Sequence, residues 1–245
     1  MKFKNKIVLV TGGSRGIGAE TAMQYSKEGA TVIITYQSNF EKAKSVESVF
    51  NGNGMIIQAD FNQKSSIENV FEIVKTHFNH LDILVNNVGI VKSNEFLNLS
   101  LEDWNNTFFT NLTSMFLCCQ LAIPLMKSGG NIVNIASLRG LPNHGRPPII
   151  DFSASKAGVI SFTKTLAKEV SPKIRVNCVS PGVTNTDITK VYSKELIEQF
   201  VSNIYLGRLI ETTEVANAIL FLSSDDASGI TGVNLMVDGG QSLSK

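Results

Sequence analysis

Short runs of apolar, mostly β-branched residues alternate along this chain with longer amphipathic segments, and this alternation constrains the fold more than any other feature. The runs that predict strands cover residues 7–10, 31–35, 56–59, 83–86, 132–136, 175–179 and 233–237. The segments with helical spacing cover residues 16–28, 40–50, 65–78, 101–127, 153–170 and 214–222. Strands that alternate with helices build a parallel sheet covered by helices on both faces. We therefore predict an α/β protein with a doubly wound parallel sheet of six to seven strands.

The length and composition predict one domain over residues 1–245. A chain of 245 residues with 43% apolar content can bury one large core. No internal repeat, low-complexity segment or proline-rich linker divides it. Within the long fourth helix, Ser100 and Asp103 form a capping pattern, and Pro124 predicts a kink or an early end. Residues 187–209, before the last helix, are predicted to form a lid that folds over a ligand.

The charge balance argues against nucleic acid or a membrane as the partner. Lys and Arg number 22 against 21 Asp and Glu, and no stretch concentrates basic residues. We find no run of the ~18 apolar residues that a membrane span requires, and no targeting signal at the N-terminus. Cys118, Cys119 and Cys178 lie inside apolar runs, which indicates reduced core residues. The sequence therefore predicts a cytoplasmic protein with a small-molecule partner and no metal site.

A glycine-rich turn joins the first predicted strand to the first helix. It reads Thr11-Gly12-Gly13-Ser14-Arg15-Gly16-Ile17-Gly18. At this place, backbone amides and a helix N-terminus face one point, which favours a pyrophosphate group. Glycines alone are a weak signal, because a purely structural turn also needs their conformational freedom. The position directly after the first strand makes nucleotide binding the preferred interpretation.

Motifs along nearly the whole chain resemble the short-chain dehydrogenase/reductase family. The turn matches that family's Thr-Gly-x-x-x-Gly-x-Gly pattern through Gly12, Gly16 and Gly18. The other matching positions are Asp60 and Phe61, Asn86-Asn87-Val88-Gly89, Asn111 in Thr-Asn-Leu, Ser137 in Asn-Ile-Ala-Ser, Lys156 in Ser-Ala-Ser-Lys-Ala-Gly, and Pro181-Gly182 with Thr184 and Thr186. The resemblance implies a Rossmann-type fold and hydride transfer between a nicotinamide cofactor and a ketone or secondary alcohol.

The resemblance also implies a set of residues that bind the cofactor. These are Gly12, Ser14, Arg15, Gly16, Ile17, Gly18, Tyr36, Asp60, Phe61, Asn87, Gly89, Lys156, Pro181, Gly182 and Thr186. Some of them have an alternative structural role, since Asn87 could simply close the turn at the end of its strand. The second strand ends in Thr35-Tyr36-Gln37-Ser38, with no carboxylate to hold the ribose hydroxyls of NAD. Together with Arg15, which suits a 2′-phosphate, this favours NADP over NAD.

One position departs from the family pattern. The resemblance implies that Ser137 polarises the substrate oxygen, Lys156 binds the nicotinamide ribose and lowers a phenol pKa, and Asn111 holds a relay water. The proton donor should be a tyrosine four residues before Lys156, and that position holds Phe152. Phenylalanine keeps the ring but has no proton to give. General-acid assistance is worth ~10²–10⁴-fold in rate, so we expect cofactor binding with strongly reduced turnover.

Three explanations for Phe152 remain open at this point. In the first, Phe152 is an engineered replacement of the tyrosine. In the second, the protein is a non-catalytic NADP-binding pseudoenzyme that acts as a sensor or scaffold. In the third, another residue donates the proton. The candidates for that donor are His144, Asp151 and Tyr192. His144 lies in a loop, residues 141–148, that is longer than expected in relatives and contributes to the pocket shape. An exposed loop histidine is the simpler interpretation.

Substrate and assembly are also inferred by resemblance. The chain is most similar to the 3-oxoacyl-carrier-protein reductase branch, notably in Thr-Asn-Leu-Thr-Ser-Met-Phe and Pro-Gly-Val-Thr-Asn-Thr-Asp. An acyl thioester or a smaller carbonyl compound is therefore the expected substrate. Relatives assemble through their long helices, so we expect a homodimer or homotetramer. Phe96, Leu97, Phe108 and Phe109 then belong to the core or a subunit interface rather than to the substrate wall.

Overall fold

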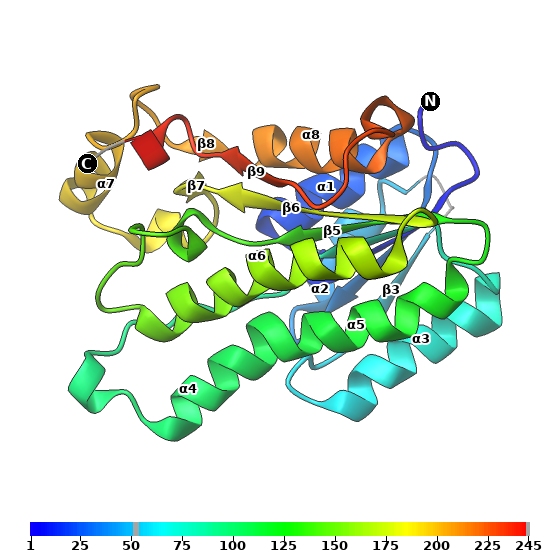
Figure 1. The fold of residues 1–245 in the computed structure, drawn as a ribbon, viewed down its shortest axis with the longest axis horizontal. Coiled ribbons are helices and arrows are strands. Elements are labelled where there is room, and N and C mark those ends of the chain that lie inside the picture. The colour runs from blue at the N-terminus through cyan, green and yellow to red at the C-terminus, as the bar shows by residue number, and fades with distance from the viewer. Residues whose placement is uncertain (51–53, 244–245) are drawn as a thin grey trace.

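A seven-stranded parallel sheet runs through the centre of the protein. The structure is a computed structural model and describes residues 1–50 and 54–243. The strands lie in the order β3-β2-β1-β4-β5-β6-β9 (Figure 1). Their bounds are β1 Ile7–Val10, β2 Thr31–Tyr36, β3 Gly54–Gln58, β4 Ile83–Asn86, β5 Gly130–Ile135, β6 Ile174–Pro181 and β9 Asn234–Val237. The predicted doubly wound parallel sheet is confirmed.

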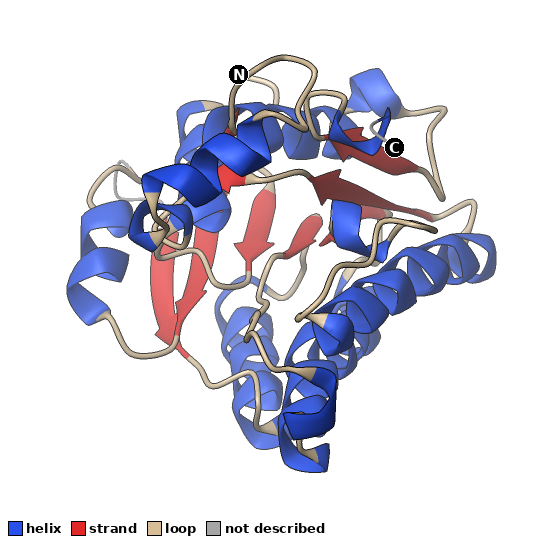
Figure 2. Ribbon diagram, turned by 90° about the vertical axis from the view of Figure 1, so that its left-hand side faces the viewer, coloured by secondary structure: helices blue, strands red, loops and turns tan. Residues whose placement is uncertain are grey.

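Helices cover both faces of the sheet, as Figure 2 shows. One face packs against α1 Gly16–Lys27, α2 Phe40–Glu47 and α8 Thr212–Ser223, and the other against α3 Lys64–Phe78, α5 Ser114–Ala122 and α6 Ile150–Val170. Strand β1 shows the reason. Ile7 and Leu9 belong to one apolar cluster and Val8 and Val10 to the other, so every position of the strand is buried. Central strands of parallel sheets are apolar on both faces for this reason.

The strand order fixes where a ligand can bind. From β1 the chain moves outward through β2 and β3, then returns to β4 and moves the other way through β5, β6 and β9. The direction therefore changes between β1 and β4, which are direct neighbours in the sheet. In open α/β sheets, ligands bind beyond the carboxyl ends of the strands at such a switch point. The segments that follow β1 and β4 are accordingly the place to look for a site.

The predicted helix at 101–127 is a composite. It consists of α4 Leu101–Phe108, a π-helical turn Phe109–Thr113, α5 and a 3₁₀ turn Ile123–Leu125. Its start is as predicted, because the Ser100 hydroxyl accepts a hydrogen bond from the Asp103 amide at 3.0 Å. Its end comes two residues earlier than predicted, since Pro124 lies in the terminal 3₁₀ turn. The π turn was not predicted, and such turns often occur at functional sites.

This composite helix corrects one expectation about apolar segments. The helix Leu101–Leu125 contains a stretch of 18 residues with a mean hydropathy of 1.4, so by length and composition alone it could cross a membrane. Half of those 18 residues are buried inside the protein. Cys118 and Cys119 are among its buried residues, and all three cysteines are free and buried, as expected of core residues. Buried core helices of globular proteins are commonly this apolar.

Other boundaries move by a few residues. Helix α6 begins at Ile150, three residues earlier than predicted, so Phe152 lies on the same helix as Lys156. Helix α2 ends at Glu47 rather than at residue 50. A small parallel pair, β7 Thr184–Asn185 and β8 Ile210–Glu211, brackets residues 187–209, which contain a 3₁₀ turn Thr189–Val191 and α7 Lys194–Val201.

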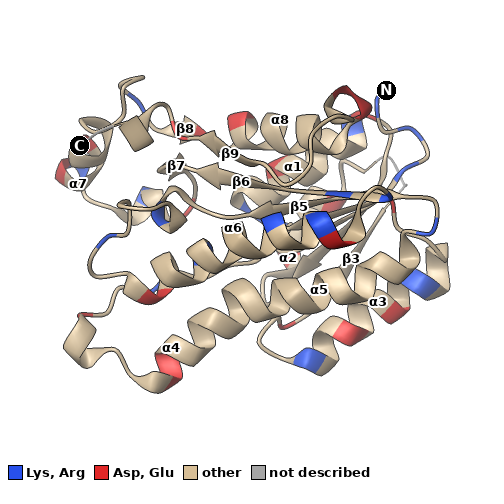
Figure 3. Ribbon diagram, in the orientation of Figure 1, with Lys and Arg blue, Asp and Glu red and all other residues tan. Residues whose placement is uncertain are grey.

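Figure 3 shows cationic and anionic residues interspersed over the outer helices.

Candidate active site

A cavity of about 450 Å³ opens at the carboxyl ends of β1, β2, β3 and β4. The residues that line it and that were predicted from the sequence are Gly12, Ser14, Arg15, Gly16, Ile17, Tyr36, Asp60, Phe61, Asn87, Gly89 and Thr186. The first five belong to the glycine-rich turn and the start of α1. The cavity therefore lies at the switch point that the strand order defines.

The glycine-rich turn is held by close contacts that no larger residue would allow. Gly12 and Gly16 have φ values of +66° and +55°, which favour glycine. A Cβ on Gly18 would lie 2.4 Å from the carbonyl oxygen of Gly12 and 2.5 Å from Asn87 Nδ2. Gly18 thus packs behind the turn and does not line the cavity. Asn87 Nδ2 donates to the carbonyl oxygens of Thr11 and Gly12 at 2.9 and 3.0 Å, so this side chain both closes the turn and lines the cavity.

The mouth of the cavity near the end of β2 carries several charges. Arg15 lines it and has no carboxylate within 4.0 Å among the residues that the structure describes. Lys42 of α2 donates to Asp187 at 2.6 Å, and this hydrogen bond lowers the pKa of the Asp187 carboxyl. The bridge links α2 to the segment that follows β7. No local sequence pattern predicts this pair, because 145 residues separate its members.

These features fit a dinucleotide. The turn offers backbone amides at a helix N-terminus, the arrangement that binds a pyrophosphate. The missing side chain at Gly16 leaves room facing Thr186, whose Cγ2 would lie 3.5 Å from an added Cβ. Beyond β2, the lining side chains Gln37, Ser38 and Asn39 are uncharged hydrogen-bonding groups. Gly12–Ile17 would hold the phosphates, and Tyr36, Asp60 and Phe61 would hold the adenosine end. Pro181 and Gly182 do not line this cavity, and Gly182 packs against Asp238 instead.

Lys156 lies next to the cavity wall. Its side chain is buried, and Nζ donates to the carbonyl oxygen of Ile135 at the end of β5, at 2.7 Å. Burial lowers the pKa of this ammonium group from 10.5 to about 8. A Cβ on Gly89 would lie 3.3 Å from Lys156 Nζ, so the absence of a side chain at Gly89 leaves the ammonium next to the cavity. Lys156 was predicted from the sequence, and its partner Ile135 was not.

Asn111 occupies the π-helical turn between α4 and α5. Its Oδ1 accepts from the amide of Ile90 at 2.7 Å, and its Nδ2 donates to the carbonyl oxygen of Ile90 at 2.9 Å. A further hydrogen bond joins Asn111 Nδ2 to Ser155 Oγ on α6 at 3.1 Å. A Cβ added to Gly89 would lie 3.3 Å from Asn111 Oδ1, the same distance as from Lys156 Nζ. Asn111 and Lys156 therefore flank Gly89, as the family resemblance implies for two residues of one site.

Ser137 follows β5 and begins a 3₁₀ turn, Leu138–Gly140. Its Oγ accepts from the amide of Arg139 at 3.1 Å. Gly140 is pressed against α6, since an added Cβ would lie 2.5 Å from the carbonyl carbon of Lys156. This contact fixes the loop after Ser137 against the helix that carries Lys156 and Phe152. Ser137, Phe152 and Lys156 thus lie on two elements that pack against each other.

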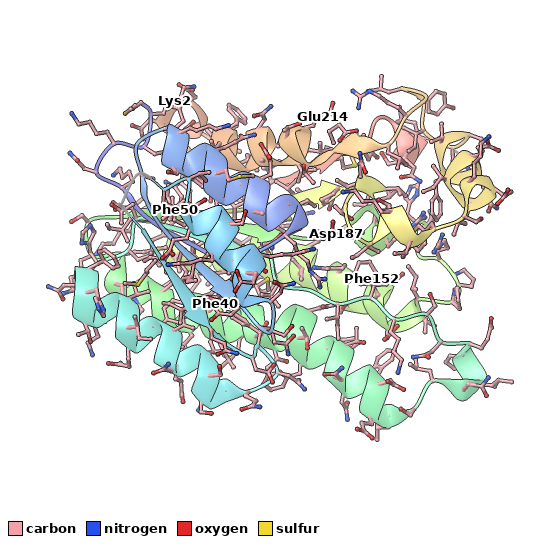
Figure 4. All side chains as sticks on the ribbon, turned by 180° about the vertical axis from the view of Figure 1, so that it is seen from behind. Lys2, Phe40, Phe50, Phe152, Asp187 and Glu214 are labelled. Carbon is pink, nitrogen blue, oxygen red and sulfur yellow. The ribbon has the colours of Figure 1, made fainter. Side chains whose placement is uncertain are left out.

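Phe152 is half-buried on α6, one helical turn before Lys156. Lys156 Nζ lies 5.9 Å from the centroid of the Phe152 ring. Figure 4 labels Phe152. The other donor candidates lie elsewhere. Asp151 is buried and accepts from Thr107 Oγ1 at 2.6 Å, while its Oδ1 has no hydrogen-bond partner. Tyr192 packs against Phe200 at 6.0 Å between ring centroids.

His144 lies against a second, separate cavity that also contains Arg139 and Arg146. None of His144, Asp151 and Tyr192 lines the larger cavity, and Ser137, Phe152 and Lys156 are not part of its lining either. Among the residues that the structure describes, no group of three or more His, Cys, Asp or Glu side chains could hold a metal ion.

Comparisons with known proteins agree with this fold. The sequence model of a family described as "Enoyl-(Acyl carrier protein) reductase" matches residues 12–242. The 3-oxoacyl-(acyl-carrier-protein) reductase of Haemophilus influenzae is 41% identical over 245 residues, covering 99% of this chain and 100% of that protein. The reductase of the same name from Escherichia coli is 39% identical, covering 98% of both chains.

The solved structures include a close relative in three dimensions. A variant of a Serratia marcescens short-chain dehydrogenase/reductase superposes with a TM-score of 0.92 and is 31% identical, covering 99% of this chain and 100% of that chain. Sequence identity of this extent over full length goes beyond a shared fold. The chain belongs to the short-chain dehydrogenase/reductase family of oxidoreductases.

Proposed function

We propose that this protein is an NADP-dependent oxidoreductase scaffold that transfers hydride between the nicotinamide and a ketone or secondary alcohol, with its proton step impaired by Phe152. The observation that carries the proposal is the buried Lys156 ammonium, which lies next to Gly89 at the cavity and 5.9 Å from the Phe152 ring. A buried cation with a lowered pKa beside a cavity marks a functional site. The relatives named as 3-oxoacyl-(acyl-carrier-protein) reductases support a 3-oxoacyl thioester or a similar carbonyl compound as the substrate.

The chain's own residues divide the work in this proposal. The bound nicotinamide supplies or accepts the hydride. Ser137 hydrogen-bonds the substrate oxygen, for which its Oγ must turn its proton toward the substrate while it accepts from the Arg139 amide. Lys156 holds the ribose hydroxyls and contributes positive charge near the developing alkoxide. Asn111, fixed to Ile90 through both of its side-chain groups, holds the π turn open toward a water. At Phe152 no hydroxyl can deliver the proton.

The proposed preference for NADP rests on charge. Arg15 lines the cavity and forms no ion pair within 4.0 Å among the described residues, although its charge helps to lower the pKa of the Asp187 carboxyl; the end of β2 offers Gln37 and Ser38 rather than an acidic residue. A 2′-phosphate pairs with a guanidinium and is repelled by a carboxylate. Arg15→Gln should therefore weaken NADPH binding by ~10-fold or more and leave NADH binding nearly unchanged, since charged hydrogen bonds contribute about 1.5–3 kcal/mol.

Calorimetric titration of both cofactors with both proteins tests this preference. Lys4→Gln is the matched control, because Lys4 is exposed and its loss changes the net charge equally. An equal loss of NADPH and NADH affinity in Arg15→Gln would mean that Arg15 shapes the turn instead of reading the phosphate. If neither cofactor binds the parent protein, the proposed function is wrong.

We further propose the assembly and organisation that the family resemblance implies: one domain over residues 1–245, residues 187–209 as a lid, a cytoplasmic location and a homodimer or homotetramer. Exposed apolar side chains support an interface along the long helices. Phe96, Leu97, Leu101 and Phe116 are 68, 93, 73 and 41% exposed. Phe108 and Phe109 are half-buried, and Phe108 stacks on Trp104. Light scattering of the parent protein and of Phe116→Glu checks this assignment, because a charge in a buried interface should reduce the mass.

A further inference from the structure

A second cavity, of about 270 Å³, lies between the loop after Ser137 and helix α7. Its lining consists of Leu138, Arg139, Asn143, His144, Gly145, Arg146, Gln199, Phe200, Asn203 and Gln241. Two guanidinium groups and an imidazole thus meet in one small space, and this lining includes neither Asp nor Glu. Such a lining attracts an anion, because both arginines are charged at every physiological pH.

The two arginines lack the partners that arginines normally have. Arg139 donates from Nη1 to the carbonyl oxygen of His144 at 3.4 Å, at the long limit for a hydrogen bond. The Arg146 guanidinium lies 5.1 Å from the centroid of the Phe200 ring, and its Nε is buried with no hydrogen-bond partner. Within residues 1–50 and 54–243, neither arginine has a carboxylate within 4.0 Å.

Their mutual arrangement is unfavourable by itself. Burial and the positive charge of Arg146 both lower the pKa of the Arg139 guanidinium. By contrast, Arg175 donates to three backbone carbonyl groups, and Arg208 makes two hydrogen bonds of 2.8 Å to the Glu214 carboxylate. Two like charges held together with an unsatisfied buried Nε cost stability unless an anion joins them.

The lining of the cavity begins at Leu138, the residue that follows Ser137. The backbone amide of Arg139 donates to Ser137 Oγ, so the first arginine is two residues from the group proposed to hold the reacting oxygen. On the other side, Gly145 packs against α6, since an added Cβ would lie 3.7 Å from the Cβ of Ser153, the residue next to Phe152. The loop with both arginines therefore bridges Ser137 and Phe152.

We propose that Arg139 and Arg146 bind a carboxylate or phosphate group carried by the substrate itself, close to its reacting carbonyl. The assignment rests on the proposed function and, of the substrates named there, favours a small anionic ketone or hydroxy compound over a 3-oxoacyl thioester. Guanidinium groups bind both oxyanions through paired hydrogen bonds. A carrier-bound acyl thioester has its phosphodiester at the far end of the pantetheine arm. A charge held next to Ser137 therefore belongs to the acyl part and not to the carrier.

Direct binding is the first test, and it needs no turnover. Calorimetry on the full chain with NADP⁺ compares 3-oxobutanoate with its methyl ester, and dihydroxyacetone phosphate with dihydroxyacetone. We expect one of the two anions to bind and its neutral counterpart to bind much more weakly. Arg146→Gln should reduce the anion affinity by ~10- to 100-fold. Arg146→Lys should restore part of it, while Lys4→Gln should have no effect. Equal binding of charged and neutral compounds would overturn the proposal.

Kinetics in the Phe152→Tyr background provide the second test. Arg139→Gln and Arg146→Gln should raise KM for the anionic ketone and leave kcat nearly unchanged, because the anion is held equally before and during the reaction. If the two variants instead impair only 3-oxobutanoyl-CoA, the anion belongs to the carrier arm and the assignment is wrong. If they change the mass of the assembly without changing anion binding, the pair contacts a carboxylate of a second copy, which also overturns it.

These outcomes separate the two proposals. Anion binding that depends on Arg146, in a protein that binds no NADPH and reduces no ketone after Phe152→Tyr, would refute the function and keep the site. Reduction of neutral and anionic ketones with equal kcat/KM would keep the function and refute the site. Thermal unfolding of each variant identifies any that fails to fold. If Arg146→Gln fails to fold, anion binding is compared between the parent protein and Arg146→Lys instead.

Discussion

Replacing Phe152 by tyrosine adds one oxygen atom at the point where the proposed proton donor belongs. The ring already lies 5.9 Å from Lys156 Nζ, measured to its centroid, on a helix that the Gly140 contact fixes against the Ser137 loop. The side chain is half-buried, so the new hydroxyl needs no repacking of a closed core. The substitution should therefore leave the fold and cofactor binding unchanged and restore only the proton transfer.

The size of the effect follows from the charge of Lys156. Two unit charges about 6 Å apart interact by about 3 kcal/mol at an effective dielectric constant of 20. That energy lowers the pKa of the introduced phenol by roughly two from its usual value of about 10. The pKa of Lys156 is itself about 8, so the ammonium is charged below that pH. A donor whose pKa lies near the working pH accelerates turnover by ~10²–10⁴-fold.

The assay follows NADPH consumption with a panel of 3-oxoacyl thioesters, simple ketones and the anionic ketones 3-oxobutanoate and dihydroxyacetone phosphate, together with NADPH and NADH binding. Phe162→Tyr is the matched control, because it adds the same atom on the same helix at a half-buried ring that packs against Phe116. We expect equal NADPH affinity in all three proteins and turnover that rises only in Phe152→Tyr. The gain should fall at high pH, as both the phenol and Lys156 lose their protons.

Two results would refute this reasoning. If the parent protein already turns over as fast as Phe152→Tyr, another group donates the proton. If NADPH binds normally but Phe152→Tyr reduces no substrate in the panel, the cavity is not that of a disabled reductase, and a non-catalytic NADP-binding protein becomes the better account.

Three further predictions follow from individual contacts. Gly18→Ala should destabilise the protein by roughly 1–3 kcal/mol and weaken NADPH binding, because its Cβ would lie 2.4 Å from a backbone oxygen; Gly229→Ala, with nothing within 4 Å, is the control in denaturant unfolding. Lys156→Met should raise the free energy of unfolding at pH 7 by up to about 3 kcal/mol, because the folded pKa of about 8 lies below the unfolded value of 10.5; in the Phe152→Tyr background it should also abolish activity. The parent's lower free energy of unfolding, relative to Lys156→Met, is fully present below pH 8 and should vanish as the pH rises through 10.5. If this difference in free energy is the same at pH 7 and pH 10, the prediction is wrong. Glu214→Gln should destabilise the protein by about 1 kcal/mol near neutral pH, and because the folded pKa of about 2 lies below 4.5, this difference should disappear as the pH falls toward 2.

Much of the fold could be predicted from the sequence because its signals are local. Each strand of the central sheet is a short apolar run, and buried parallel strands are apolar on both faces. The errors lie where local signals are weak. The π turn Phe109–Thr113 and the 3₁₀ turn Ile123–Leu125 keep the helical spacing of their neighbours, so the periodicity predicts one continuous helix. The short pair of β7 and β8 joins residues distant in the chain, which no local pattern reveals.

The candidate site divides in the same way. Gly12, Asn111, Ser137 and Lys156 belong to sequence motifs. The structure places Asn111 and Lys156 beside Gly89, Gly12 after β1 and Ser137 after β5. The bridge between Lys42 and Asp187 and the Arg139–Arg146 cavity could not be predicted, because their residues belong to no motif and meet only through packing. For Gly18, the sequence identified the residue, but its contact is with the turn and not with the cavity.

The energetics of Lys156 bear on what Phe152 means. A buried ammonium group lowers the stability of the folded protein, and a methionine would fill the same space at no such cost. Yet the chain keeps Lys156, its acceptor Ile135, and a glycine at position 89 that leaves the ammonium beside the cavity. It also keeps Asn111 in the π turn with both side-chain groups bonded. A scaffold with no use for a nicotinamide site would gain stability by losing this arrangement. The intact surroundings therefore favour a site that still binds its cofactor and lacks one hydroxyl group, which is the property that Phe152→Tyr tests.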